Sequence, residues 1–339
     1  MVRATGGTGW PEILCPLGII PGMTDEDADG LSAGLQRVCD EIFPGSRPSG
    51  TRRLTGGHLT RMDAFRIAGA ADGPALVLRR YRAEPFWREV MEGCERTLAF
   101  AAGHGLPVPR VVWSDPVGRL FGTPAMVLTL IPGAPLGNPP DPIGWAAQMG
   151  TVLSAIHSVP VGPEDLPHLP PPFEVAPMFL KRALEEPRPE ITSHPLARLV
   201  LPALRRLAGR LVEARSVFVH GDFWPGQVIW RRGRLEGVVD WDFPRLDDPG
   251  VDLGYCRLDI SLMAGPEAAA SFLTAYTRAA GAPPALMPLW DLIAAFQAME
   301  RPGMWHREGF AGIGRPELHG EEVEERLAEF VDSVLRSLG

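Results

Sequence analysis

Several features that would place this chain in a common class are missing from its sequence. Only 4 of its 339 residues are cysteines, and their spacing contains no CxxC pair or other metal-ligand pattern. This argues against a disulfide framework or a zinc site and favours reduced, packed thiols. No apolar run approaches the ~20 residues that a membrane span needs, and the chain does not open with a secretory signal pattern. We therefore expect a cytoplasmic protein without a membrane partner.

Positive charge is also scarce. Lys and Arg together number 33 against 41 Asp and Glu, which gives a net charge of −8. A nucleic-acid-binding protein would concentrate basic residues in a patch or stripe. The charge balance therefore argues against a nucleic-acid partner and leaves a small molecule, including a cationic one, as the expected partner.

The length and an apolar fraction of 45% suit two lobes or two domains. Residues 1–23 are rich in Gly and Pro without periodicity, which is typical of a flexible arm or of a start assigned upstream of the true initiator. Residues 24–132 predict strands with few helices, whereas residues 133–339 predict mainly helices. The boundary falls at Pro132-Gly133, where an apolar strand stops.

The first of these regions predicts β-hairpins. Runs of strand-forming residues between Thr51 and Tyr81 are separated by Gly56-Gly57 and by Asp72-Gly73. A glycine pair can let the backbone approach an anion closely, although a tight turn without a ligand is the more common interpretation. Residues 84–102 then predict a helix ahead of an extended segment fixed by two prolines.

Two stretches place carboxylates directly after apolar strands. Val219–Trp230 reads VHGDFWPGQVIW, and Gly237–Tyr255 reads GVVDWDFPRLDDPGVDLGY. Asp222 follows the first strand at a sharp glycine turn, and Asp240 closes the second. A polar hairpin centred near Gly233 predicts that these two strands are antiparallel neighbours. Their carboxylates would then lie close together.

Two neighbouring carboxylates suit phosphoryl transfer. One can take or orient a hydroxyl proton, and the other can bind Mg²⁺, which prefers hard oxygen ligands. Plainer roles are also open, because Asp222 and Asp240 could cap turns and His220 could hydrogen-bond the backbone. A metal-dependent hydrolase using Asp222, Asp240 and Asp242 is disfavoured, because no His/Glu cluster completes a two-metal site.

These stretches resemble the aminoglycoside phosphotransferase and choline kinase-like family, small-molecule relatives of the protein kinases, and the resemblance runs from about residue 54 to 305. It implies an α+β, two-lobed protein-kinase-like fold, with a small β-rich N-lobe carrying one main helix and a larger, mostly helical C-lobe. By this resemblance Asp222 is the catalytic base or hydroxyl positioner, and His220 braces the same catalytic loop. Asp240 would bind Mg²⁺ on the nucleotide phosphates, and Asp252 would be mainly structural.

The resemblance also implies where the nucleotide binds. Gly56 and Gly57 would lie in the hairpin that covers the nucleotide. The segment from Leu128 to Ile131 would be the hinge whose backbone meets the purine base. ATP or GTP would be the co-substrate, together with Mg²⁺.

Two positions depart from the family pattern. Arg79 stands where the family has a phosphate-binding lysine; it keeps the charge and can grip phosphate with its fork, and Glu95, or otherwise Glu92, would be its ion-pair partner. Gln227 stands where the family has a metal-binding Asn, and its oxygen lies one methylene, roughly 1.5 Å, farther out. Gln227 could bind the metal through a bent rotamer, be replaced by a water, or leave the second metal position weakened.

We therefore expect transfer of the γ-phosphate of ATP or GTP to a hydroxyl of a small molecule. The acceptor could be an aminoglycoside-like antibiotic, for which Asp259, Asp291 and Glu300 could supply an acidic pocket. A metabolite hydroxyl, on a sugar, a choline-like alcohol or an amino acid, is equally open. The alternative is a nucleotide-binding pseudokinase, a sensor or partner protein without efficient turnover, which Arg79 and Gln227 would favour.

Overall fold

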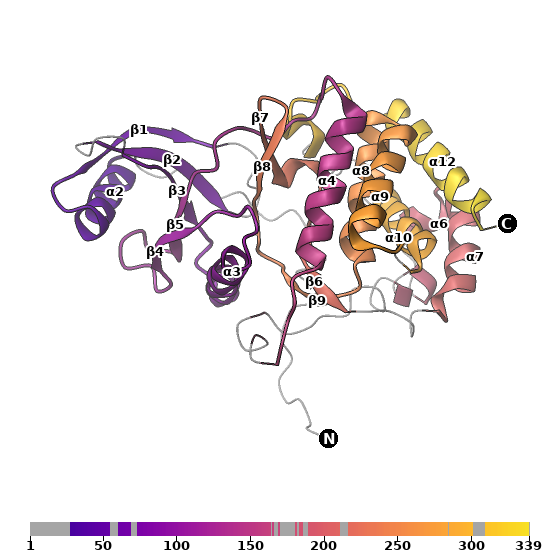
Figure 1. Cartoon of the computed structure of the whole chain (residues 1–339), viewed down its shortest axis with the longest axis horizontal. Helices are drawn as coiled ribbons and strands as arrows, with labels where there is room; N and C mark the ends of the chain where they lie inside the picture. The colour runs from indigo at the N-terminus through magenta and orange to yellow at the C-terminus, as the bar shows by residue number, and fades with distance from the viewer. Residues whose placement is uncertain are drawn as a thin grey trace.

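The fold is α+β, with a strand-rich end and a helical end (Figure 1). The computed structural model describes residues 28–54, 60–68, 73–163, 165, 169, 180–181, 183–185, 189–210, 216–283, 285–300 and 309–338. Within these residues, no helix combines the length and apolarity that a membrane crossing requires.

The strand-rich end is built on a five-stranded antiparallel sheet with the order β1-β2-β3-β5-β4. The antiparallel pairing of β1 with β2 and of β2 with β3 confirms the hairpins predicted between Thr51 and Tyr81, with the first strand starting earlier, at Arg47. The strands are β1 (Arg47–Arg53), β2 (Arg61–Ala68), β3 (Ala75–Arg80), β4 (Val111–Asp115) and β5 (Ala125–Thr129).

Two helices accompany this sheet but join different cores. Helix α2 (Ala28–Ile42) buries Leu35 and Val38 with the side chains of β2, β3 and β5. Helix α3 (Pro85–Gly103) instead buries Met91 and its neighbours in the same apolar cluster as the C-terminal helices. Burial of apolar area is the main stabilising term in such packing, so α3 ties the two ends of the molecule together.

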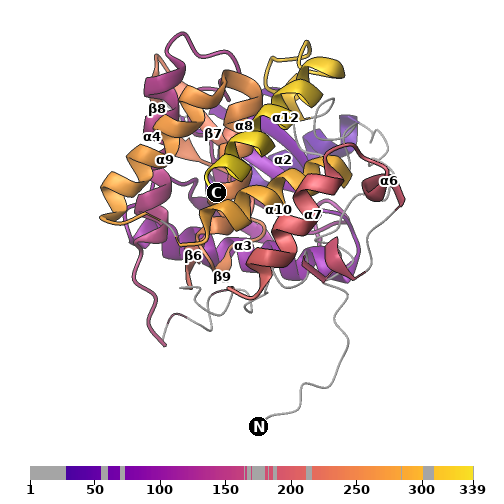
Figure 2. The ribbon, with the colours of Figure 1, turned by 90° about the vertical axis from the view of Figure 1, so that its right-hand side faces the viewer.

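The helical end packs α4, α8, α9 and α10 against one another (Figures 1 and 2). The approach of α4 to α9 is close: a Cβ on Gly150 would lie 2.2 Å from the carbonyl oxygen of Phe272, so only glycine fits there. The helices are α4 (Pro142–His157), α6 (Pro189–Thr192), α7 (Ala197–Ala208), α8 (Gly250–Ala264), α9 (Pro266–Ala280), α10 (Met287–Glu300) and α12 (Glu321–Arg336).

Two short antiparallel sheets link these ends. The expectation that the strand before Asp222 pairs with the strand before Asp240 is wrong: β6 (Val217–Val219) pairs with β9 (Arg245–Asp247). The reason is that a 3-10 turn at Pro225–Gln227 starts a further strand, which becomes the hairpin partner of the strand before Asp240. That hairpin joins β7 (Val228–Arg231) to β8 (Arg234–Val238).

The turn between β7 and β8 lies at Gly233, as the sequence predicted. Arg232 and Gly233 have φ angles of 53° and 76°, as a two-residue turn between right-twisted strands requires. Gln148 on α4 accepts from the backbone N–H of Leu235 and donates to the carbonyl of Gly233, which fixes the hairpin against the helices.

Candidate active site

The loop that carries Asp222 depends on a glycine. Gly221 has φ +85°, and a Cβ there would lie 2.1 Å from the carbonyl oxygen of Phe243. Any other residue would therefore be both strained and obstructed. This turn places Asp222 directly after the buried end of β6 with its side chain exposed.

Asp252, at the start of α8, holds this loop by hydrogen bonds to its backbone. Its carboxylate accepts the backbone N–H groups of His220 at 2.7 Å and Gly221 at 2.8 Å. His157 Nε2 lies 3.1 Å from the same carboxylate, and its Nδ1 lies 3.0 Å from the Tyr276 hydroxyl. Burial alone would raise the pKa of Asp252, but the hydrogen bond and charge of His157, with His220, hold it below its usual value.

His157 is a member of the site that the sequence did not reveal. It ends α4, far along the chain from Asp252, and no local spacing connects the two residues. Only the packing of α4 beside α8 and β6 brings them together. Asp252 itself has the structural role that the resemblance implied.

The His220 ring joins the two loops of the site. Its Nδ1 accepts from the backbone N–H of Asp222 at 3.3 Å, so its Nε2 donates to the carbonyl of Val239 at 2.9 Å. Burial lowers the pKa of His220, which favours this neutral form. The ring is fully buried, and it therefore positions Asp222 and Asp240 without reaching outward.

Gln227 bridges the two carboxylates. Its Nε2 lies 3.3 Å from Asp222 Oδ2 and 3.0 Å from Asp240 Oδ2, so the predicted closeness of the two acids is confirmed. Asp240 has φ +65°, a left-handed conformation that costs a non-glycine residue of the order of 1 kcal/mol. Such strain is typical of functional positions.

The two carboxyls have opposite electrostatic surroundings. Burial alone would raise the pKa of Asp240, but the charge and hydrogen bond of Arg79, helped by His220 and Gln227, lower it. Displacement of water by the surrounding protein raises the pKa of Asp222, the charge of Asp240 adds to the rise, and the hydrogen bond from Gln227 opposes it. Because the Asp222 side chain is exposed, solvent screens part of that rise.

Arg79 lies on the other side of Asp240. Its Nη2 donates to Asp240 Oδ1 at 2.5 Å and to Asp242 Oδ2 at 2.6 Å, and its Nε donates to the Thr60 hydroxyl at 3.1 Å. Its side chain is nearly inaccessible to solvent. Burial alone would lower the pKa of Arg79, but the charge of Asp242 helps to raise it above its usual value. The guanidinium is thus a fixed cation beside the carboxylates.

The predicted ion pair between Arg79 and Glu95 is wrong. Glu95 accepts from the Ser114 hydroxyl on β4 at 3.1 Å, and Glu92 pairs with Arg88 one turn earlier on α3. Successive residues of a helix point about 100° apart, and Cys94 is the residue that faces Asp242. The partner of Arg79 therefore comes from the loop after β8.

From the sequence, a metal-binding role for Asp242 was disfavoured, and a loop-capping or supporting role was preferred. Asp242 is buried, and its second oxygen accepts from the Tyr81 hydroxyl at 3.1 Å. Burial raises the pKa of Asp242 to about 6, while the charge of Arg79 opposes the rise. Both oxygens of Asp242 are therefore engaged by protein groups.

The residues around Asp240 suit Mg²⁺ better than a metal held entirely by protein. Among the described residues, no group of three or more His, Cys, Asp or Glu side chains could hold a metal ion. Mg²⁺ commonly takes one or two carboxylates together with phosphate oxygens and water. Asp240 supplies a carboxylate, and Gln227 supplies a carbonyl oxygen once its amide presents Oε1 in place of Nε2. The donor set fits on these terms.

The other predicted nucleotide contacts stay predictions. Gly56 and Gly57 lie outside the described residues. Leu128 is a buried β5 residue opposite Val77, and Ile131 packs against Gly237 on β8. A role for the 128–131 segment in binding a base stays a prediction.

Two of the three acids considered for the acceptor have side chains that the structure describes, and these have different surroundings. Asp291 is buried and paired with Arg257, inside the contact between α8 and α10, so it is removed from an acceptor site. Asp259 is buried on α8, and its charge is among those that raise the pKa of Asp222. The side chain of Glu300 is outside the described set.

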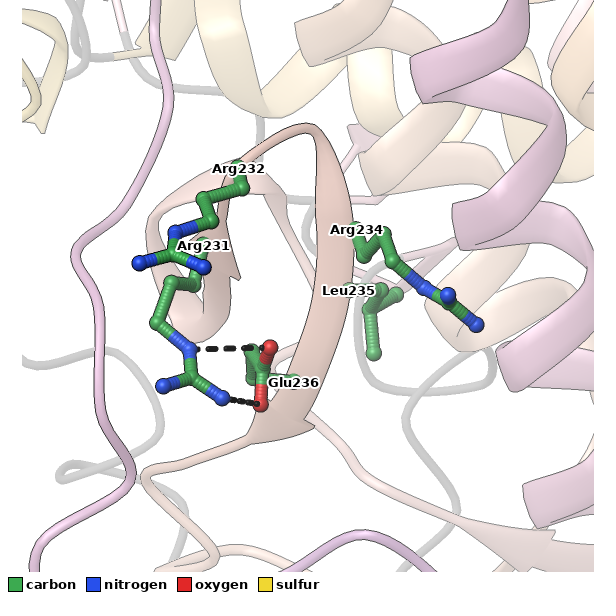
Figure 3. Close-up of a pocket in the computed structure, with 5 residues that line it drawn as sticks. All are labelled: Arg231, Arg232, Arg234, Leu235 and Glu236. Carbon is green, nitrogen blue, oxygen red and sulfur yellow. Dashed lines mark hydrogen bonds and ion pairs between the residues drawn. The ribbon is translucent and has the colours of Figure 1, made fainter.

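A pocket of about 460 Å³ lies away from these residues, on the β7–β8 hairpin (Figure 3). It is lined by side chains of the hairpin itself, and Arg231 forms an ion pair with Glu236. The loop that carries Asp222 contributes no residue to its lining, so this pocket is separate from the carboxylates.

The fold and the two neighbouring carboxylates are what the comparisons with known proteins must account for. The chain matches the phosphotransferase enzyme family over residues 51–330, and it belongs to this family. A search of curated proteins finds no match.

Solved structures of similar fold include antibiotic phosphotransferases. Macrolide 2'-phosphotransferase MphH from Brachybacterium faecium is 20% identical with a TM-score of 0.56, covering 88% of this chain and 97% of that one. The GDP and kanamycin complex of APH(2")-IIIa is 16% identical with a TM-score of 0.61, covering 86% and 98%. The streptomycin-ATP complex of APH(2")-IIa is 17% identical with a TM-score of 0.54, covering 82% and 91%. At these identities the likeness shows the fold.

Proposed function

We propose that the protein transfers the γ-phosphate of ATP or GTP to a hydroxyl of a small molecule, with Asp222 as the base or hydroxyl positioner. The observation that carries the proposal is the bridge from Asp222 through Gln227 to Asp240, with Arg79 on the far side of Asp240. A single exposed carboxylate thus stands beside a cation and a second carboxylate, which is what in-line phosphoryl transfer requires.

Each group has a physical task. Asp222 is the exposed acid, and its raised pKa brings it closer to that of an effective general base near neutral pH. Arg79 can bind phosphate oxygens with its fork. Asp240 and Gln227 would hold Mg²⁺, which supplies neutralisation of phosphate charge when bound. His220 and Asp252 keep the loop in place.

The two departures from the family pattern follow the composition of the whole chain. The sequence contains one lysine, Lys181, and one asparagine, Asn138. Arg at position 79 and Gln at position 227 are therefore expected replacements in a chain that avoids both residue types. This supports turnover over the pseudokinase alternative, because the substitutions need not mark loss of catalysis at this site.

The acceptor is a small molecule with a free hydroxyl. The net charge of −8 and the negative field from Asp259 near Asp222 are compatible with a cationic acceptor such as an aminoglycoside. Structural relatives bound to kanamycin and streptomycin support this class. A neutral metabolite hydroxyl is the second candidate, since Asp259 alone offers a polycation only one negative charge.

The test is thermal unfolding with ATP or GTP at millimolar concentration, each with and without Mg²⁺, with nucleotide consumption measured in the same samples. A nucleotide at ~100 times its Kd stabilises the folded state by roughly 2.7 kcal/mol. We expect a Mg²⁺-dependent rise in melting temperature, and consumption that increases with a hydroxyl acceptor. No rise with either nucleotide would overturn the proposal. Binding without consumption across aminoglycosides, sugars and amino alcohols would establish the pseudokinase instead.

A further inference from the structure

We infer that Asp242, held by Tyr81, is the permanent counter-ion that positions Arg79, and that Asp240 is only its exchangeable partner. The inference rests on the proposed function, because it concerns how Arg79 is kept in place while Asp240 is released to a metal. Asp242 is thus a positioning residue rather than a ligand or a base.

Both carboxylate oxygens of Asp242 are engaged by protein groups, so neither is free to bind a metal. One oxygen accepts from Arg79 Nη2 at 2.6 Å, and the other accepts from the Tyr81 hydroxyl at 3.1 Å. Cys94, on α3, is buried beside this carboxyl and affects its pKa. The side chain is 4% exposed, against 33% for Asp240. A carboxylate buried to this degree is stabilised by remaining paired.

Asp240 has a different setting. Its Oδ1 accepts from the same Arg79 nitrogen that Asp242 binds, and its Oδ2 accepts from Gln227. Arg79 therefore has a second carboxylate partner when Asp240 turns to a cation. Without Asp242, the same turn would leave a buried guanidinium with no carboxylate, which is costly.

Tyr81 and Cys94 explain why α3 does not supply the counter-ion. The guanidinium carbon of Arg79 lies 5.0 Å from the centre of the Tyr81 ring, so the ring and its hydroxyl contact both partners of the ion pair. Cys94 takes up the place on α3 that faces them. Glu95, the adjacent residue, bonds to β4 instead.

The experiment titrates Mg²⁺ against the rise in melting temperature produced by ADP or GDP, whichever stabilises the native chain. Asp242→Asn and Tyr81→Phe are compared with Glu95→Gln, which removes the α3 carboxylate that the sequence favoured. Asp242→Asn strengthens the hold of Arg79 on Asp240, so the Mg²⁺ concentration at half-effect should rise by about tenfold. Tyr81→Phe should raise it about threefold, and Glu95→Gln should leave it unchanged.

A purely structural role would lower the melting temperature without nucleotide but leave the Mg²⁺ midpoint in place. An unchanged midpoint in folded Asp242→Asn or Tyr81→Phe protein overturns the inference, and so does an equal shift in Glu95→Gln. If Asp242→Asn does not fold, the Tyr81→Phe midpoint alone decides. If the native chain responds to neither diphosphate, the proposed function fails first, and the two failures are thereby distinguished.

Discussion

The site has an exposed part and a buried part, and they differ in how freely they can rearrange. Asp222 and Gln227 are joined by one hydrogen bond of 3.3 Å, and Asp222 is exposed. Arg79 and Asp242 are joined by an ion pair of 2.6 Å with side chains at most 5% exposed. Groups that meet an acceptor must be accessible, whereas a cation that meets phosphate benefits from being fixed in advance.

Substitutions in the two parts should therefore differ in their effects on turnover and on folding stability. An exposed polar side chain contributes little to folding, and its replacement is usually within ±0.5 kcal/mol. A buried charge that loses its partner costs several kcal/mol. Substitutions in the exposed part should therefore change the rate and spare the fold, and substitutions in the buried part should lower both rate and stability.

The largest effect on rate is expected for Asp222→Asn. The amide keeps the shape of the side chain but cannot accept the hydroxyl proton, so turnover should fall by about 10²–10⁴. Because the side chain is exposed, the free energy of unfolding should change by less than about 1 kcal/mol. Steady-state nucleotide consumption and urea unfolding measure the two quantities.

Asp332→Asn is the matched control for that variant. Asp332 is an exposed acid on α12, paired with Arg336 far from the site, and its replacement should leave turnover unchanged. If Asp222→Asn turns over as fast as this control, Asp222 is neither base nor positioner.

The buried part is tested next by Asp252→Asn. An amide offers one oxygen to the N–H groups of His220 and Gly221, and it loses the charge that His157 meets. The free energy of unfolding should fall by about 2–4 kcal/mol. Turnover should fall as well, since the loop that carries Asp222 is released.

The same variant gives a pH signature with a definite sign. The pKa of Asp252 is lower in the folded protein than in the unfolded chain, so its contribution is complete above the unfolded value of about 3.9 and is lost as pH falls through the folded value. The difference in unfolding free energy between native protein and Asp252→Asn should be constant above about pH 5 and narrow below it. A difference that widens on acidification would contradict the assignment.

The sequence predicted the exposed part well because its signals are local. The Gly221 turn, the strand before Asp222 and the five-residue spacing to Gln227 are all encoded within one short segment, and the hairpin turn at Gly233 was placed correctly. The fold class followed from the resemblance carried by the same stretches. The α+β architecture and the family match confirm it.

The buried part was predicted poorly because its contacts join distant segments. The sequence predicted a partner for Arg79 on α3. Helix phase instead turns Glu95 toward β4, and Asp242, 163 residues away along the chain, pairs with Arg79. The pairing of β6 with β9, and of His157 with Asp252, likewise depends on tertiary packing. Spacing along a chain does not report which side of a helix faces the site.

Gln227→Asn should have the smallest effect on turnover and stability. It also tests most directly whether the exposed part can rearrange. The shorter amide loses its bridge between Asp222 and Asp240, but the position is only partly buried, so the unfolding free energy should change by about 0.5 kcal/mol or less. If the extra methylene weakens a Mg²⁺ position, the asparagine oxygen should improve it, and turnover at limiting Mg²⁺ should rise a few-fold.

Gln36→Asn is the control, because Gln36 also bonds a carboxylate, that of Asp40, but on the outer surface of α2. No gain for Gln227→Asn at any Mg²⁺ concentration would mean that the longer side chain already reaches its ligand position through a bent rotamer, or that a water serves there. In either case the unfolding free energy should stay nearly constant, because the exposed part of the site contributes little to folding.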